Sequence, residues 1–130
     1  MAGAAKGKSP FYPGQPFPDC AVPWAVTEDK INEAVARIVA AAQPQSVIIF
    51  GSAARGEAGW ANDLDLMVIV DDAVRKCREE SVRLRRTLRG IFMPMDIVVV
   101  RRGDFERLKA TPGLLCDTVA REGKVAYERR

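Results

Sequence analysis

Three short apolar runs constrain the fold of this chain more than any other feature of its sequence. They span residues 46–50 (SVIIF), 64–70 (LDLMVIV) and 95–100 (MDIVVV) and are rich in β-branched side chains. Runs this short and this apolar are typical of strands buried inside a sheet. We therefore expect a small, largely buried β-sheet at the centre of the molecule.

Segments with helical periodicity surround these runs. Ile31, Val35 and Ile38 recur at the spacing of one helix face, in a helix that Thr27 can cap and Pro44 ends. The other expected elements are short helices directly after Gly51, over 104–109 from Asp104 and over 111–123 from Thr111-Pro112, a long helix over 73–89 that begins at Asp71 or Asp72, and an edge strand over 125–128. The order α-β-α-β-α-β-α-α-β predicts an α/β domain with a small mixed sheet flanked by helices.

The length of 130 residues suits one domain. Residues 1–23 hold five of the eight prolines, which lack a backbone donor and exclude regular helix or central strand. We expect an extended or disordered arm over 1–23, pinned to the domain or to a partner by its aromatic side chains, and a folded domain over 24–130. The chain has no apolar run long enough to span a bilayer and no apolar leader. Its three widely spaced cysteines predict reduced thiols in a cytoplasmic protein.

The complete absence of histidine restricts the chemistry. It excludes Ser-His-Asp and Cys-His hydrolysis and every histidine-ligated metal site. Carboxylates, hydroxyls, amines or guanidinium groups must perform any reaction. The net charge of +3 permits contact with nucleic acid without requiring it.

Two carboxylates stand at the start of the second apolar run. Asp63 and Asp65 are two residues apart, so on a strand they project from the same face with Cα atoms roughly 6.6 Å apart. Two like charges this close to an apolar run repel each other and are costly to desolvate, and a divalent cation between them offsets that cost. Asp96 begins the third run, so three acids meet if the two strands are neighbours. Such a set suits two Mg²⁺ ions, or Mn²⁺, about 3.5–4 Å apart.

A glycine-serine turn follows the first apolar run. Gly51 lets the backbone approach a phosphate closely, and Ser52 with the first N–H groups of a following helix would hold terminal phosphates. Arg55 can add a charge-assisted contact. Together these segments predict a cradle for a metal-bound triphosphate. A plain turn glycine with acids at a strand entry remains the alternative on spacing alone.

The stretch GSAARGEAGWANDLDL resembles the signature of the minimal nucleotidyltransferase family, within the polymerase-beta-like superfamily. That signature is Gly-Ser, ten residues and Asp-x-Asp, a spacing that Gly51-Ser52 and Asp63-x-Asp65 meet. Ala54-Arg55-Gly56 also matches, whereas Asn62 stands where the family often has serine. The third acid of the family matches Asp96, and the tail REGKVAYE is similar to family endings.

The resemblance implies the polymerase-beta-like palm fold and the transfer of a nucleoside monophosphate from a triphosphate, with ATP as the expected donor, to a hydroxyl acceptor. It implies that Asp63, Asp65 and Asp96 bind the metal ions, and that Asp96 acts as a further ligand or as the base for the acceptor. Gly51, Ser52 and Arg55 would bind the nucleotide.

Within this resemblance, the length of the chain indicates the kind of acceptor. Larger relatives carry a second domain for it, whereas stand-alone members of this length are paired with a small helical partner of the HEPN group. By that resemblance the chain is an antitoxin that adds AMP to a tyrosine of a HEPN-type toxin. The alternatives are a module that neutralises a partner by contact alone, and one subunit of an antibiotic nucleotidyltransferase.

The expected helix over 73–89 carries seven lysines and arginines from Arg75 to Arg89. Its apolar stripe is narrow and is expected to comprise Val74, Cys77, Ser81, Val82, Arg85 and Leu88. A solvated basic face explains the charges most simply, and an acidic partner surface is the next interpretation. Nucleic acid ranks last, because no aromatic residue interleaves the charges as a stacking platform.

Overall fold

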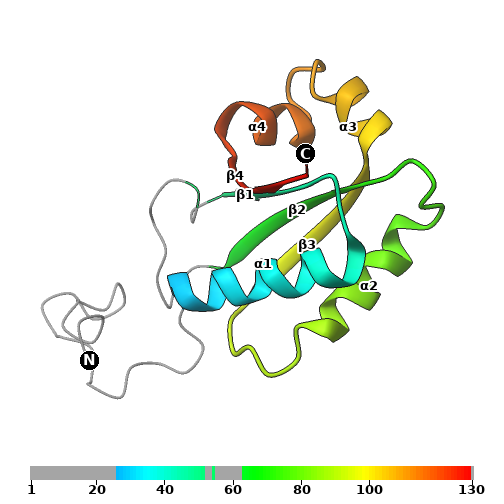
Figure 1. The fold of residues 1–130 in the computed structure, drawn as a ribbon. Coiled ribbons are helices and arrows are strands. Elements are labelled where there is room, and N and C mark those ends of the chain that lie inside the picture. Colours follow the sequence, from blue (N-terminus) through cyan, green and yellow to red (C-terminus); the bar gives the residue numbers. More distant parts are fainter. Residues whose placement is uncertain (1–25, 52–53, 55–62, 130) are drawn as a thin grey trace, which may run out of the picture.

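The computed structural model describes residues 26–51, 54 and 63–129 (Figure 1). The elements in these ranges are α1 (Glu28–Ala42), β1 (Ser46–Phe50), β2 (Leu64–Val70), α2 (Cys77–Thr87), β3 (Met95–Arg101), α3 (Arg102–Leu108), α4 (Leu115–Glu122) and β4 (Lys124–Glu128). The proline-rich arm and most of the segment between β1 and β2, where a short helix was expected, lie outside the described residues. The remaining predicted elements are present in the predicted order.

The four strands form one mixed sheet in the order β3-β2-β1-β4. β1 pairs antiparallel with both β2 and β4, whereas β2 and β3 run parallel. β4 lies at one edge of the sheet, as predicted, and β3 lies at the other. The expected α/β fold with a small mixed sheet flanked by helices is therefore confirmed.

Helices cover both faces of the sheet (Figure 1). On β2, Leu64, Leu66 and Val68 belong to the core beneath α1 and α2, whereas Met67 and Ile69 belong to a second core beneath α3 and α4. This alternation follows from the two-residue period of a strand. A strand with apolar residues on both faces must be covered on both sides, which explains the continuous apolar run in the sequence.

Helix α1 begins and ends as its sequence predicts. The backbone N–H of Lys30 donates to the Thr27 hydroxyl oxygen at 3.3 Å, which satisfies one of the free donors of the first turn. The helix ends at Ala42, and the next residue, Gln43, adopts the left-handed conformation with φ of 46° directly before Pro44. Among the described residues, no helix has the length and apolarity needed to cross a membrane.

Helix α2 starts later than the expected residue 73, at Cys77. The Asp71 carboxylate accepts a hydrogen bond from the N–H of Ala73 at 2.9 Å and forms a local turn. The Asp72 carboxylate accepts from the N–H of Gly103 at 2.8 Å, near the start of α3. The prediction that Asp71 or Asp72 stands at the start of this helix is therefore wrong, because α2 begins at Cys77 and both carboxylates bond elsewhere.

The expected apolar stripe of α2 is also partly wrong. Leu84, which was not expected in it, and Leu88 are the buried residues at this helix, and Cys77 and Ser81 are half-buried on the same side. Val82 and Arg85 point outward, and the Val82 side chain is 44% exposed. The stripe therefore follows one helical face through Cys77, Ser81, Leu84 and Leu88.

The starts of α3 and α4 differ from the prediction as well. Asp104 lies inside the first turn of α3, where its carboxylate accepts hydrogen bonds from Arg101 and Arg107, and does not cap the helix. Helix α4 begins at Leu115 and not at the predicted Thr111, because residues 111–114 form a turn before it. Cys77 and Cys116 are free thiols, and Cys116 is buried as a small apolar side chain.

Candidate functional site

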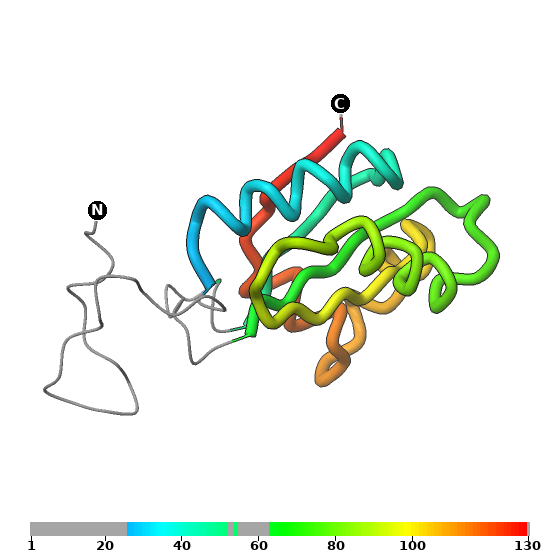
Figure 2. Tube along the Cα trace, turned by 90° about the horizontal axis from the view of Figure 1, so that it is seen from below, coloured from blue at the N-terminus to red at the C-terminus, as the bar shows by residue number. Residues whose placement is uncertain are grey.

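The predicted acids meet at one end of the sheet, where β2 and β3 begin. Asp65 pairs with Phe50 at the end of β1 on one side and with Asp96 of β3 on the other. Figure 2 shows that the start of β2, the loop before β3 and the N-terminal end of α1 gather at the same end of the molecule. We call the set Asp63, Asp65 and Asp96 the acidic end.

The carboxylates of Asp65 and Asp96 belong to the same face of the sheet. Asp65 alternates with Leu64 and Leu66, and so shares the face of Met67 beneath α3 and α4. Because β2 and β3 are parallel and Asp65 is in register with Asp96, the two strands present both side chains on that face. The placement expected if the two strands were neighbours is therefore present in the structure.

The electrostatic environment of Asp65 differs from that of an ordinary surface acid. Partial burial, and then the negative charges of Asp96 and Asp63, raise the pKa of the Asp65 carboxyl above its usual value of 3.8. Asp63 and Asp96 are themselves exposed. The site therefore holds one half-buried carboxylate next to two exposed ones, and its ionised form is unfavourable without a compensating positive charge.

Gly51 lies directly against this half-buried acid. Its φ of +74° is in the left-handed region that favours glycine, and a Cβ atom at this position would collide with the Asp65 carboxylate. The backbone at Gly51 therefore passes close to the acidic end. Ser52 and Arg55, the other two predicted nucleotide-binding residues, lie outside the described residues.

Among the residues that the structure describes, one basic side chain contacts the acidic end. The Arg85 Nη2 atom lies 3.6 Å from the Asp96 Oδ1 atom, in an ion pair whose side chains are 54% and 61% exposed. Sequence reasoning assigned Arg85 to the stripe of α2 and missed this contact. The spacing between the two residues offers no signal for it, because it depends on how α2 packs relative to β3.

The donor set fits a hard divalent cation in its chemistry. Carboxylate oxygens are the ligands that Mg²⁺ and Mn²⁺ prefer, and the raised pKa of Asp65 reflects crowded negative charge that a cation would relieve. In the described part of the chain, no group of three or more cysteine, aspartate or glutamate side chains is arranged to hold a metal ion as it stands. In this arrangement the Asp96 carboxylate is paired with Arg85.

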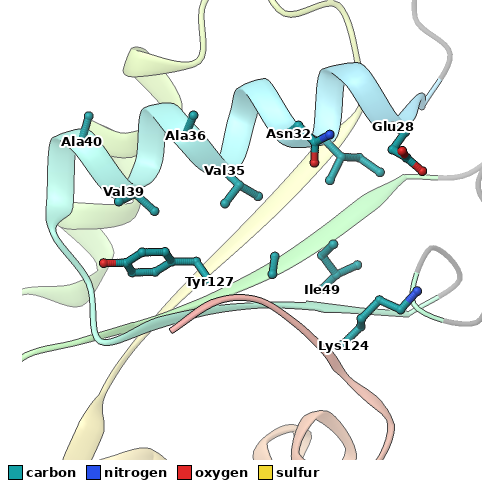
Figure 3. Close-up of a pocket in the computed structure, with 11 residues that line it drawn as sticks. Glu28, Asn32, Val35, Ala36, Val39, Ala40, Ile49, Lys124 and Tyr127 are labelled. Carbon is teal, nitrogen blue, oxygen red and sulfur yellow. The ribbon is translucent and has the colours of Figure 1, made fainter. Parts of the chain in front are cut away.

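A groove of about 770 Å³ lies between α1 and β4, beneath the opposite face of the sheet (Figure 3). Val35 and Val39 of α1 point toward the sheet, and Tyr127 of β4 points back toward α1. Glu28 and Lys124 lie at one end of it. This lining is mainly apolar and includes none of the acids of the acidic end, so the groove does not suit a metal-bound phosphate.

The fold and the acidic end agree with a known family. The model of the family described as "Polymerase beta, Nucleotidyltransferase" matches residues 32–130. The chain belongs to this family. The match begins within α1 and includes every strand of the sheet and all three acids. It therefore confirms the resemblance that the Gly-Ser and Asp-x-Asp spacing indicates.

Solved structures share the nucleotidyltransferase fold. One is a candidate nucleotidyltransferase from Sulfolobus solfataricus, with 20% identity, a TM-score of 0.54 and coverage of 78% of this chain and 79% of the other. Another is a chain in a mutant form of the toxin–antitoxin complex MntA-HpeT, with 20% identity, a TM-score of 0.52 and coverage of 81% and 75%. At these identities the similarity concerns the fold. Among curated proteins, none matches this nucleotidyltransferase-family chain significantly.

Proposed function

We propose that this chain is a metal-dependent nucleotidyltransferase that moves a nucleoside monophosphate, AMP from ATP, to a hydroxyl group of a protein partner. The observation that carries the proposal is the acidic end: Asp65 and Asp96 are in register on parallel strands, and Gly51 lies against Asp65. Family membership gives this arrangement its chemical context.

The proposed reaction needs few groups from the protein. The acceptor oxygen forms a bond to the α-phosphorus, the bond from that phosphorus to the bridging oxygen breaks, and diphosphate leaves with the electron pair. The acceptor proton passes to a carboxylate, for which we propose Asp96, because the chain contains no histidine. Asp63, Asp65 and Asp96 would hold Mg²⁺, which neutralises charge on the phosphates when bound.

The exposure of the acidic end suits a large acceptor. Asp63 and Asp96 are exposed, so a protein surface can approach them. The similarity of the fold to a chain of a toxin–antitoxin complex supports a toxin as the partner. We therefore propose that the chain is an antitoxin, and that the acceptor is a tyrosine of a HEPN-type toxin.

The test is a transfer assay with ATP labelled at the α-phosphate, Mg²⁺ and a HEPN-type protein as the candidate acceptor. We expect label on the partner with the unaltered chain and with Glu122→Gln, an exposed acid at the end of α4 that serves as the control. Asp65→Asn and Asp96→Asn should lower the transfer at least about 100-fold, the scale on which losing one group that stabilises developing charge reduces a rate. Full labelling by both variants, or no labelling by the unaltered chain with any nucleoside triphosphate, would refute the proposal.

The same variants separate catalysis from simple contact. If the toxin is neutralised by Asp65→Asn as well as by the unaltered chain, binding alone accounts for the antitoxin effect. If neutralisation is lost while the variant still binds the toxin, transfer of AMP is required.

A further inference from the structure

Arg85 connects the acidic end to the opposite side of the sheet. Helix α2 packs with Leu84 and Leu88 in the core that it shares with α1, whereas the acids lie on the α3 and α4 face. Since β3 is the outermost strand, Arg85 reaches Asp96 around the edge of the sheet. Its guanidinium lies 3.6 Å from the carboxylate that the proposed function assigns to metal binding.

This contact differs from the other ion pairs of α2. Lys76 pairs with Glu79 and Arg83 pairs with Glu80, each one turn away on the same helix segment. Pairs of this type mainly support the helix. Among the described residues, the Arg85 pair is the one ion pair that joins a basic side chain of this helix to an acid of another element. Supporting the helix therefore does not explain its geometry.

We propose that Arg85 is a positioning residue that holds Asp96 when no metal is bound and competes with the divalent cation for that carboxylate. The inference rests on the proposed function, in which Asp63, Asp65 and Asp96 bind the cation. A carboxylate oxygen paired with a guanidinium has less negative potential to offer a metal ion, and the two positive charges repel each other. Metal uptake by this chain is therefore coupled to release of the Arg85 pair.

The exposure of both partners sets the size of this coupling. The Arg85 and Asp96 side chains are 54% and 61% exposed, so solvent screens their attraction. Pairs of this kind contribute little, and we expect removal of the Arg85 charge to tighten cation binding about two- to fivefold. An effect of this size leaves the pair easy to displace when the cation arrives.

The experiment measures binding of Mn²⁺ alone to the full chain, stripped of metal by chelation, by calorimetry and by the electron paramagnetic resonance of free Mn²⁺. Arg85→Gln is compared with Arg86→Gln. Arg86 is the matched control, because it is the next residue of α2, is exposed, carries the same charge and makes no ion pair among the described residues. Circular dichroism verifies that both variants are folded.

We expect Arg85→Gln to bind Mn²⁺ about two- to fivefold more tightly than Arg86→Gln, which should bind much like the unaltered chain. Equal affinities for the two variants, or weaker binding by Arg85→Gln, would overturn the inference while leaving the metal site intact. If the unaltered chain and both variants all fail to bind Mn²⁺, the proposed metal site itself is wrong, and the inference is wrong with it.

Discussion

Asp65 is the residue at which the structural and functional demands on this chain conflict most clearly. Its neighbours on the same face, Met67 and Ile69, are buried, and Asp65 itself is half-buried. An apolar residue here would suit the fold better than a carboxylate with two acidic neighbours. Its presence is therefore better explained by ligand binding than by folding.

The substitution Asp65→Asn should stabilise the metal-free protein while removing transferase activity. The pKa of Asp65 is raised in the folded state, so its ionisation destabilises the fold as the pH rises through that pKa. Below the usual value of 3.8 both proteins are neutral at this position, and their stabilities should agree. At pH 7 we expect the variant to be more stable by up to about 1 kcal/mol, the scale for partly exposed charges. Urea unfolding at pH 3 and pH 7 measures both values, and a loss of stability at pH 7 would contradict this explanation.

Gly51→Ala should abolish activity at a modest cost in stability. An alanine at a φ of +74° costs roughly 1–2 kcal/mol, and its Cβ would force the Asp65 carboxylate to move. Gly90→Ala is the matched control, since Gly90 has a φ of +92° and open space around its Cβ position. We expect similar losses of unfolding free energy in the two variants and loss of AMP transfer in Gly51→Ala alone. Equal activities would show that the contact with Asp65 has no functional role.

The sequence predicts the acids of this site better than their surroundings. The two-residue period of a strand is enough to place Asp63 and Asp65 on one face, and a third acid at the start of another strand suggests that Asp96 joins them. Periodicity carries no information on strand register or on side chains that reach around a sheet edge. For this reason Arg85 could not be assigned to the site before the structure.

At the scale of the elements, buried strands are the most predictable parts of this chain. β1 and β2 have the predicted bounds, because an apolar run ends where its polar flanks begin. Helix starts depend on where a few polar side chains bond. Asp72 was expected to begin α2 but bonds to the backbone near the start of α3, a contact across 31 residues that no local pattern predicts.

Glu80→Gln tests how α2 is attached to α1. The Glu80 carboxylate accepts hydrogen bonds from Arg83 at 2.9 and 2.6 Å, and Arg83 also donates to the Ala41 carbonyl oxygen of α1 at 3.1 Å. The hydrogen bond from Arg83 lowers the pKa of Glu80 below 4.5, so its stabilising effect is present above pH 4.5 and is lost as the pH falls through the folded-state pKa.

We expect Glu80→Gln to lose about 0.5–1 kcal/mol of unfolding free energy at pH 7 and to match the unaltered chain well below pH 4.5. Glu79→Gln is the control, because Glu79 is 73% exposed and pairs with Lys76 at 3.4 Å. Urea unfolding at several pH values measures both variants. A deficit of Glu80→Gln that is unchanged at low pH would show that the ion pair is not its cause.

At the scale of the whole molecule, the two helical layers leave the acidic end open. Beneath α3 and α4, the strand residues Met67 and Ile69 are 0% and 4% exposed, whereas Asp63 at the same strand's entry is exposed. The apolar groove lies on the other face, between α1 and β4 (Figure 3). The sheet thus separates the acidic end from the apolar groove. This separation suits a highly charged ligand at the acidic end and an apolar ligand in the groove.

Binding of a cation at the acidic end should stabilise the whole domain, because the ligands come from two neighbouring strands, β2 and β3, that unfold with it. A ligand that binds only the folded state contributes about 2.7 kcal/mol at a concentration 100 times its dissociation constant. For a domain near 100 residues, each kcal/mol raises the melting temperature by about 4–8 °C. We therefore expect saturating Mn²⁺ to raise the melting temperature of the unaltered chain by roughly 10 °C or more.

Differential scanning fluorimetry with and without Mn²⁺, at constant ionic strength, measures this rise in melting temperature. The double variant Asp65→Asn with Asp96→Asn should show no such rise, since each substitution removes a charged ligand. An equal rise in the double variant would place the stabilising cation elsewhere on the molecule, and the acidic end would then have to be explained without a metal.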